Sequence, residues 1–307
     1  MTTAGRIAVV GDALIDELRD ARGVREFVGG SALNVALGLA RLGLPTVLLA
    51  MVGDDEEGDR IRSSLEDFGV ELVASPAPRG TARAISIRSA SGEPQYRFDE
   101  AARTRRIRFS DAAREHLVGA AARVVSGFPF DDDAQTDDLA DALAAGSGMI
   151  AVDPNPRAGM LQERDRFRRG FERLAASADL VKIGEDDAAL LYEESVDAAT
   201  ARLRDAGARA VLATRGAAGA SVSVDGMTLS APTSAVPGPV VDTMGAGDAV
   251  LASAVASLLA EHPVDPEQWR SLLMTAMDVA AATCRFEGAL LRLPSALRGL
   301  DVDRVGS

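Results

Sequence analysis

The chain has 307 residues, 47% hydrophobic and 26% charged, a composition typical of a folded globular protein that needs no disulfide or metal to support its core. Its formal net charge of −13 argues against a nucleic-acid-binding protein, since such proteins ordinarily present a basic face. The single cysteine excludes an internal disulfide, and no apolar run approaches the ~20 residues of a membrane span.

The N-terminal segment predicts a buried strand and a cytoplasmic protein. Residues 6–11 form a short, apolar, β-branched run that ends in glycine, the pattern of a strand buried on both faces. Asp12 and Asp16 follow at once, so the apolar run is too short for a signal peptide. Because the lone Cys284 also fits a reducing compartment, we expect a cytoplasmic location.

Helical and strand patterns then alternate along the chain. Residues 31–42 repeat apolar side chains at helical spacing, residues 45–53 resemble a buried strand, and residues 55–69 predict a helix. This alternation predicts an α/β fold with a doubly wound, mostly parallel sheet flanked by helices.

Residues 80–109 break this alternation. The segments TARAISIRS and PQYRFDE each alternate in side-chain character at period two around SGE, which predicts an antiparallel hairpin with one wet face. An antiparallel insert in a parallel chain is a candidate lid, and residues 17–28 could add strands to it. Since an exposed strand edge favours pairing, this lid could join two copies of the chain in a homodimer.

The second half returns to alternating strands and helices. Short buried strands are expected within residues 122–127, 148–156, 178–184 and 208–216. Residues 220–231 predict a hairpin with Asp225-Gly226 at its tip, and alanine-rich helices are expected at about 246–260 and 267–284. No repeat or linker divides the sequence, so we expect residues 1–307 to form one domain with the lid inserted in it.

The most informative stretch is residues 240–260, VVDTMGAGDAVLASAVASLLA. Two glycines flank Ala246, Asp248 follows, and a long apolar helix begins there. Glycine lets the backbone turn its N–H groups outward, and a helix N-terminus adds positive potential, so this is an anion cradle beside a carboxylate that can accept a proton. The alternative is an inert aspartate in a first helical turn. Since no GxxxxGK[ST] loop and no complete GxGxxG motif are present, P-loop kinases and NAD-linked oxidoreductases are excluded.

Several motifs together are similar to one family. DTMGAGD (242–248) resembles the C-terminal signature of the ribokinase / phosphofructokinase-B family of carbohydrate kinases, and GGSALNVALGLARLG (29–43) resembles its N-terminal signature. VGDDEEG, DPNPR, VKIGEDD and TRGAAG follow in family order over nearly the whole chain. The resemblance implies a ribokinase-like fold with a small antiparallel β lid, and an enzyme that transfers phosphate from ATP to a sugar.

On this resemblance, Asp248 is the general base that activates the sugar hydroxyl, and three backbone amides form the anion hole. Asp16, Gly30 and Asn34 would hold sugar hydroxyls, which suits carboxylate and amide groups on a glycine wall. Arg157, in DPNPR, would reach phosphate, or is a surface arginine. The three anion-hole amides belong to Gly245, Ala246 and Gly247.

The nucleotide side is implied in the same way. Thr214, Gly216 and Gly219 would line the ATP site. Asp187 matches the acidic end of the family's NxxE element, which acts on Mg²⁺ through water, although acids are also favoured at any helix start. Members bind a monovalent cation near the positions of Asp242 and Gly288, so stimulation by K⁺ is compatible with the sequence.

The sequence departs from the family mainly on the nucleotide side. Gly184 stands where NxxE has asparagine, and Met277 stands where many members have asparagine near the adenine. The opening GDALID and the DPNPR segment resemble fructokinases, so a fructose-like acceptor comes first, with 2-keto-3-deoxygluconate or a nucleoside as alternatives. A sugar-binding sensor that kept the fold without the reaction is the other class. Cys284 and Trp269 are expected to pack. The arginine-rich segment 103–108 could contact phosphate near the lid, but a solvated charge run is expected first.

Overall fold

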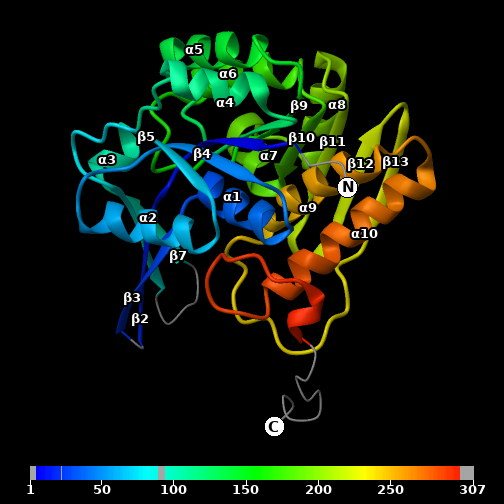
Figure 1. Ribbon diagram of the computed structural model, residues 1–307. Coiled ribbons are helices and arrows are strands. Elements are labelled where there is room, and N and C mark those ends of the chain that lie inside the picture. Colours follow the sequence, from blue (N-terminus) through cyan, green and yellow to red (C-terminus); the bar gives the residue numbers. More distant parts are fainter. Residues whose placement is uncertain (1–4, 22, 89–93, 298–307) are drawn as a thin grey trace.

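The computed structural model describes residues 5–21, 23–88 and 94–297, which form two β-sheets and their surrounding helices (Figure 1). The large sheet has the strand order β13-β12-β11-β10-β9-β8-β1-β4-β5. From β5 to β11 its neighbours pair in parallel, and β12 and β13 extend it in antiparallel fashion. The strands are β1 (Ile7–Gly11), β4 (Thr46–Met51), β5 (Glu71–Ser75), β8 (Ala122–Ser126), β9 (Met149–Asp153), β10 (Leu180–Gly184), β11 (Ala210–Thr214), β12 (Ala220–Val224) and β13 (Met227–Ala231).

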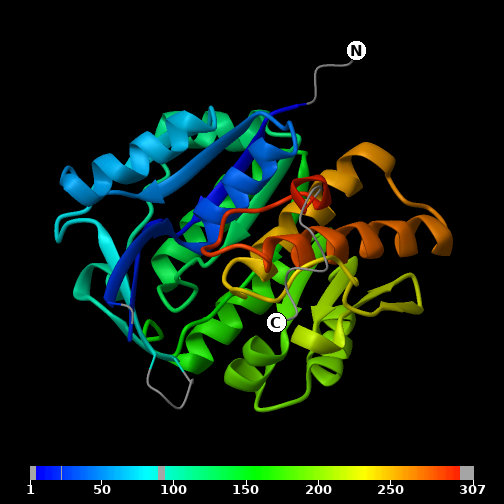
Figure 2. The ribbon, with the colours of Figure 1, turned by 90° about the horizontal axis from the view of Figure 1, so that it is seen from below.

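Helices cover both faces of this sheet. One apolar core joins the sheet to α1, α2, α9 and α10, and a second joins its other face to α4 through α8 (Figures 1 and 2). The helices are α1 (Ser31–Arg41), α2 (Glu56–Asp67), α3 (Glu100–Arg103), α4 (Asp111–Gly119), α5 (Asp133–Ala144), α6 (Arg164–Ala175), α7 (Glu185–Tyr192), α8 (Val196–Ala206), α9 (Ala246–Glu261) and α10 (Pro266–Thr283), with short 3₁₀ helices η1 (Gly216–Ala218) and η2 (Pro294–Leu297).

The two-sided cover explains the strand composition. Ile7 and Val9 on β1 point into the first core, whereas Ala8 and Val10 point into the second, so a strand covered on both faces needs an uninterrupted apolar run. The predicted doubly wound sheet is confirmed. Trp269 is buried in the first core, as expected.

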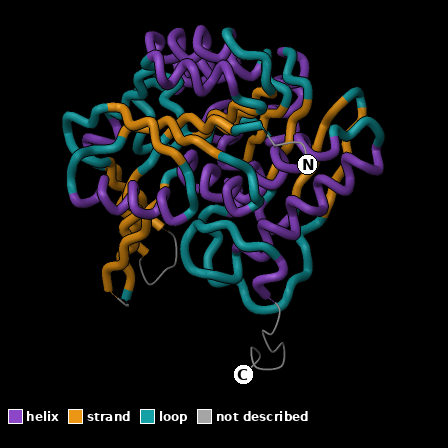
Figure 3. The backbone as a smooth tube through the Cα atoms, in the orientation of Figure 1, coloured by secondary structure: helices purple, strands orange, loops and turns teal. Residues whose placement is uncertain are grey.

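The small sheet forms the predicted lid, with one difference in pairing. Its order is β3-β2-β6-β7, from β2 (Leu14–Asp20), β3 (Gly23–Gly29), β6 (Ala82–Arg88) and β7 (Pro94–Phe98), and it stands apart from the large sheet (Figure 3). The outer pairs are antiparallel, but β2 and β6 run parallel. The turn expected at SGE falls on residues 91–93, outside the described residues.

The lid strands end earlier than the predicted segment 80–109. Asp99 accepts a hydrogen bond from the backbone N–H of Ala102 at 2.8 Å, and this cap starts α3 directly after β7. Residues 104–109 then follow without regular structure. In the part of the chain that the structure describes, no helix is both long and apolar enough to span a membrane.

Candidate active site

Asp248 lies in the first turn of α9 and is held by two donors from α1. The Ser31 hydroxyl donates to Oδ1 of Asp248 at 2.7 Å, and the Asn34 amide donates to Oδ2 at 2.8 Å. Ser31 in turn contacts the hydroxyl of Ser126, at the end of β8, at 2.6 Å. These bonds fix the orientation of the carboxylate and leave further lone pairs on both oxygens for an incoming hydroxyl. Asn34 therefore positions Asp248, and its contact with a sugar stays a prediction.

The backbone before Asp248 forms the turn that the glycines predicted. Gly245 caps α9 in the left-handed region at φ +74°, and a Cβ there would lie 2.4 Å from the Ala289 carbonyl oxygen. The amides that follow belong to a first helical turn, where N–H groups lack intrahelical acceptors. The Ala246 amide makes a long 3.2 Å bond to the Thr243 carbonyl, which leaves the Gly247 amide as the better placed donor for an anion.

Two further carboxyl groups, of Asp12 and Asp16, lie within electrostatic range of Asp248. Asp12 follows β1 and accepts from the Ala32 amide at 3.1 Å, while Asp16 lies on β2 beside Gly29. Burial raises the pKa of Asp16 to about 7, with a further contribution from Asp12. Burial also raises the pKa of Asp12. Desolvation is thus the main reason why these two carboxyl groups favour their neutral forms.

Backbone and arginine complete this acceptor side. Gly30 caps α1 at φ +104°, and a Cβ there would meet the Asp12 carbonyl oxygen at 2.7 Å, so only glycine allows this close approach. The exposed Arg157 lies within electrostatic range of Asp12 and Asp16 and opposes the rise in their pKa. The structure therefore brings Asp16, Gly30 and Arg157 to one region.

Arg105 corrects the expectation that residues 103–108 are a solvated charge run. Its guanidinium is half-buried and donates to the carbonyl oxygens of Ala102 at 3.1 Å and Gly127 at 3.3 Å. Asp12 lies near enough to favour its charged form, and the two residues line the same small cavity. The sequence pattern missed this because charge density alone does not show which arginine folds inward.

The predicted nucleotide residues lie at the carboxyl end of β11. Thr214 ends the strand, Gly216 starts η1 at φ +48°, and Gly219 leads into β12 at φ +90°. A Cβ on Gly219 would lie 2.2 Å from the Ala231 carbonyl oxygen. Gly184, at the neighbouring end of β10, pairs with Thr214, so this departure from the family lies beside the same loop. Met277 is buried in the first core.

Lys182, Asp153 and Asp187 form a buried cluster of charged side chains near Asp248. Lys182 on β10 places Nζ 2.9 Å from Oδ2 of Asp153 and 3.8 Å from Oδ2 of Asp187. Burial would lower the pKa of Lys182, but the two carboxylates outweigh this and raise it, so the ammonium is charged at neutral pH. Burial raises the pKa of Asp153, and the ammonium limits that rise. Neither Lys182 nor Asp153 was singled out from the sequence.

These acids fit a metal held mostly by water and phosphate. Oδ2 of Asp187 accepts a hydrogen bond from the Gly184 amide at 2.7 Å, and this bond closes the first turn of α7. Among the described residues, no group of three or more acidic, histidine or cysteine side chains is arranged to hold a metal ion. Mg²⁺ commonly needs only one or two carboxylates beside its waters and phosphate oxygens, so Asp187 is compatible with such a site, and its role stays a prediction.

Asp242 and Gly288, expected near a monovalent cation, lie together. Gly288 donates its amide to Oδ2 of Asp242 at 3.2 Å, and the Met244 amide donates to Oδ1 at 3.1 Å. Asp242 is buried, and these contacts tie the segment before α9 to the segment after α10. A role in cation binding stays a prediction.

The chain was compared with protein families and known proteins. Residues 4–296 match the pfkB family carbohydrate kinase model. A fructokinase of Rhizobium leguminosarum bv. trifolii is 31% identical over 276 residues, 87% of this chain and 83% of that protein. A crystal structure of fructokinase with bound ATP from Xylella fastidiosa superimposes with a TM-score of 0.81 at 22% identity, over 97% of this chain and 98% of that one.

A fructokinase double mutant from Vibrio cholerae O395, crystallised with fructose, ADP and potassium, superimposes with a TM-score of 0.75 at 21% identity, over 94% of each chain. These solved structures establish the ribokinase-like fold, and the sequence matches establish the ancestry. The chain belongs to the pfkB family of carbohydrate kinases, whose members are ATP-dependent phosphotransferases.

Proposed function

We propose that this kinase transfers the γ-phosphoryl group of ATP to a hydroxyl of a small, fructose-like sugar, with Asp248 as the general base. The observation that carries the proposal is the placement of Asp248: a carboxylate in the first turn of α9, oriented by Ser31 and Asn34 and directly following a glycine-rich turn. A proton acceptor and an anion cradle thus share one helix end.

The proton step follows from this geometry. The sugar hydroxyl donates its hydrogen bond to a free lone pair of Asp248 and transfers the proton as its oxygen attacks the γ-phosphorus. The bond from phosphorus to the bridging oxygen breaks, and ADP leaves with that oxygen. Ser31 and Asn34 hold the carboxylate in place, so little reorganisation accompanies the transfer.

Charge on the transferring group is balanced by the start of α9. The helix N-terminus is positive, and the amides of Gly245, Ala246 and Gly247 would face the region where negative charge develops. When Mg²⁺ is bound with ATP, it supplies further neutralisation of the phosphate oxygens, and Asp187 and Asp153 would hold its water shell. Thr214, Gly216 and Gly219 would line the remainder of the nucleotide.

The acceptor would bind between Asp16, Gly30 and Asp248, next to the lid. Carboxyl groups can accept from adjacent sugar hydroxyls, and Asp16, whose pKa is raised to about 7, can also donate when protonated. Fructose is the first choice because the matched relative is named a fructokinase. The arginines Arg105 and Arg157 suit a 2-keto-3-deoxygluconate carboxylate as well, and nucleosides remain a further alternative.

The competing function is a sugar sensor without catalysis. It is supported by the departures at Gly184 and Met277 on the nucleotide side. It is opposed by the presence of Asp248, since loss of the base is the change expected in a chain that kept the fold without the reaction.

The direct test is ADP release coupled to a reporter, with Mg·ATP and fructose, ribose, 2-keto-3-deoxygluconate or nucleosides as acceptors. We expect release that depends on one of these acceptors. Adding K⁺ to the same assays tests the Asp242–Gly288 region. Tight sugar binding by calorimetry, with no ADP release from any acceptor, would support the sensor instead.

A further inference from the structure

Lys182 is unusual in both sequence and structure. It is the only lysine in the chain, whose other 32 basic residues are all arginine. Arginine therefore serves nearly every solvent-exposed and ion-pairing position, yet this one buried position carries a compact ammonium. Lysine and arginine differ in shape, because the ammonium is a point charge whereas the guanidinium is a planar fork.

The surroundings of Lys182 concentrate charge at one place in the fold. The residue is 6% exposed and lies at the middle of β10. Asp153, at the end of the adjacent strand β9, is fully buried, and Asp187 comes from α7. Two carboxyl groups from different elements thus face one ammonium, and these contacts fix its position.

The ammonium also lies close to Gly247 in the glycine-rich turn that forms the predicted anion cradle. A Cβ built on Gly247 would lie 3.1 Å from Nζ and 3.5 Å from Cε of Lys182. Glycine at this position keeps side-chain atoms out of the space between the ammonium and the first turn of α9. Asp248 is near enough to favour the charged form of Lys182, so the cation and the base belong to one site.

We propose that Lys182 is a catalytic residue whose ammonium contacts the transferring phosphoryl group, opposite the amide of Gly247. Asp153 and Asp187 hold the ammonium in place, and it supplies a fixed charge where the phosphoryl oxygens gain negative charge. This assignment rests on the proposed function, which places the γ-phosphoryl group at the same cradle.

The alternative is a purely structural role, in which Lys182 only neutralises Asp153 inside the fold. The two roles predict different effects of nucleotide binding on the environment of the ammonium. If the lysine is structural, ATP and ADP should change that environment equally. If it contacts the γ-phosphoryl group, ATP should change it more than ADP does.

The single lysine makes this measurable in the intact chain. Protein grown with [13C]lysine gives one Cε resonance from Lys182, without chemical modification or assignment by mutation. With Mg²⁺ present, we expect the β,γ-imido analogue of ATP to shift this resonance clearly more than ADP does, and the acceptor alone to leave it nearly unchanged. Equal shifts with ADP and the analogue, under saturation by both, would overturn the proposal.

Steady-state kinetics provide a second test of the role of Lys182. Lys182→Met should lower kcat by roughly 10²-fold or more, as removal of one charge-stabilising donor does, while the KM for the acceptor changes little. Lys182→Met leaves the buried Asp153 carboxylate without its cation, which could unfold the chain. The double variant Lys182→Met/Asp153→Asn removes this unpaired charge. Its kcat is compared with that of Asp153→Asn alone. Equal turnover in these two would overturn the proposal. If the parent enzyme phosphorylates no acceptor, the proposed function fails, which is a separate outcome.

Discussion

At the scale of single residues, the site brings together three carboxyl groups that differ in hydrogen bonding and in burial. Asp248 receives two hydrogen bonds from α1, whereas Asp16 and Asp12 are crowded and desolvated. Burial raises the pKa of Asp12 and Asp16, and a neutral Asp16 can both donate a hydrogen bond to a bound hydroxyl and accept one from it.

This crowding predicts how stability depends on pH. An aspartate in the unfolded chain titrates near ~3.9, whereas the pKa of Asp16 in the folded chain is about 7. The folded chain therefore binds this proton more tightly, and stability falls as the pH rises between these two values. Asp16→Asn should raise the Tm by roughly 2 °C or more at pH 8, and by less at pH 5.

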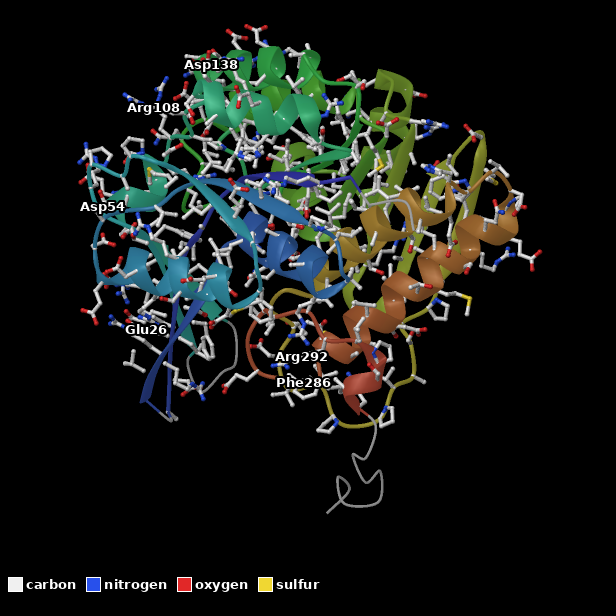
Figure 4. All side chains as sticks on the ribbon, viewed as in Figure 1. Glu26, Asp54, Arg108, Asp138, Phe286 and Arg292 are labelled. Atoms are coloured by element: carbon white, nitrogen blue, oxygen red, sulfur yellow. The ribbon has the colours of Figure 1, made fainter. Side chains whose placement is uncertain are left out.

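The control is Asp138→Asn, which changes an exposed carboxylate on α5 (Figure 4). Its effect on Tm should be small at both pH values. A Tm gain for Asp16→Asn that is larger at pH 5 than at pH 8 would contradict the raised pKa.

At the scale of elements, the turns that carry the site depend on glycines in the left-handed region. Gly219 and Gly226 both have positive φ, of +90° and +74°, but a Cβ on Gly226 meets nothing within 4 Å. They therefore form a matched pair on either side of β12, one crowded and one open.

Gly219→Ala should perturb the nucleotide loop, and Gly226→Ala should not. Both variants strain the backbone by about 1–2 kcal/mol, but only the first pushes a methyl group against the Ala231 carbonyl oxygen at 2.2 Å. We expect Gly219→Ala to lower the Tm further and to raise the KM for ATP about fivefold or more. Equal values of KM for ATP in the two variants would show that this turn is not part of the nucleotide site.

At the scale of the whole molecule, an ion pair joins the small sheet to α2. Arg83 on β6 contacts Glu57 on α2 at 2.6 Å. Within the small sheet it also contacts Glu17 on β2 at 2.8 Å and Glu26 on β3, which is labelled in Figure 4. In the proposed function the small sheet acts as a lid that excludes water from the acceptor, so these contacts should bear on coupling between the sugar and ATP.

Arg83→Met should loosen this attachment. We expect the KM for the acceptor to rise by about threefold to tenfold, since charge-assisted bonds at a partly exposed site contribute modestly. ATP hydrolysis without acceptor should increase in parallel. Arg79→Met, which removes an exposed pair with Glu100, is the matched control. If both variants keep the parental KM and hydrolysis rate, the Arg83 contacts do not govern the lid.

Local patterns predicted most of the elements. The two alanine-rich helices were expected at about 246–260 and 267–284, and the structure gives Ala246–Glu261 and Pro266–Thr283. The hairpin at Asp225-Gly226 is also confirmed, with both residues at positive φ. These features depend on residues close in sequence, so periodicity and turn chemistry are enough to find them.

Long-range pairing was harder to predict. The parallel pairing of β2 with β6 joins strands far apart in sequence, and the alternation in each strand does not specify its partner. Lys182 and Asp153 were missed for the same reason: they stand on different strands, and only the adjacency of β9 and β10 brings their side chains together. The single lysine was the available signal.

The central claim is that Asp248 accepts the proton of the sugar hydroxyl, and Asp248→Asn tests it most directly. The amide keeps the size of the side chain but removes the base. We expect kcat to fall by roughly 10³-fold, with Tm and calorimetric sugar affinity close to the parent, and Asp278→Asn on the exposed side of α10 to behave as the parent. Near-parental turnover in Asp248→Asn would contradict the account.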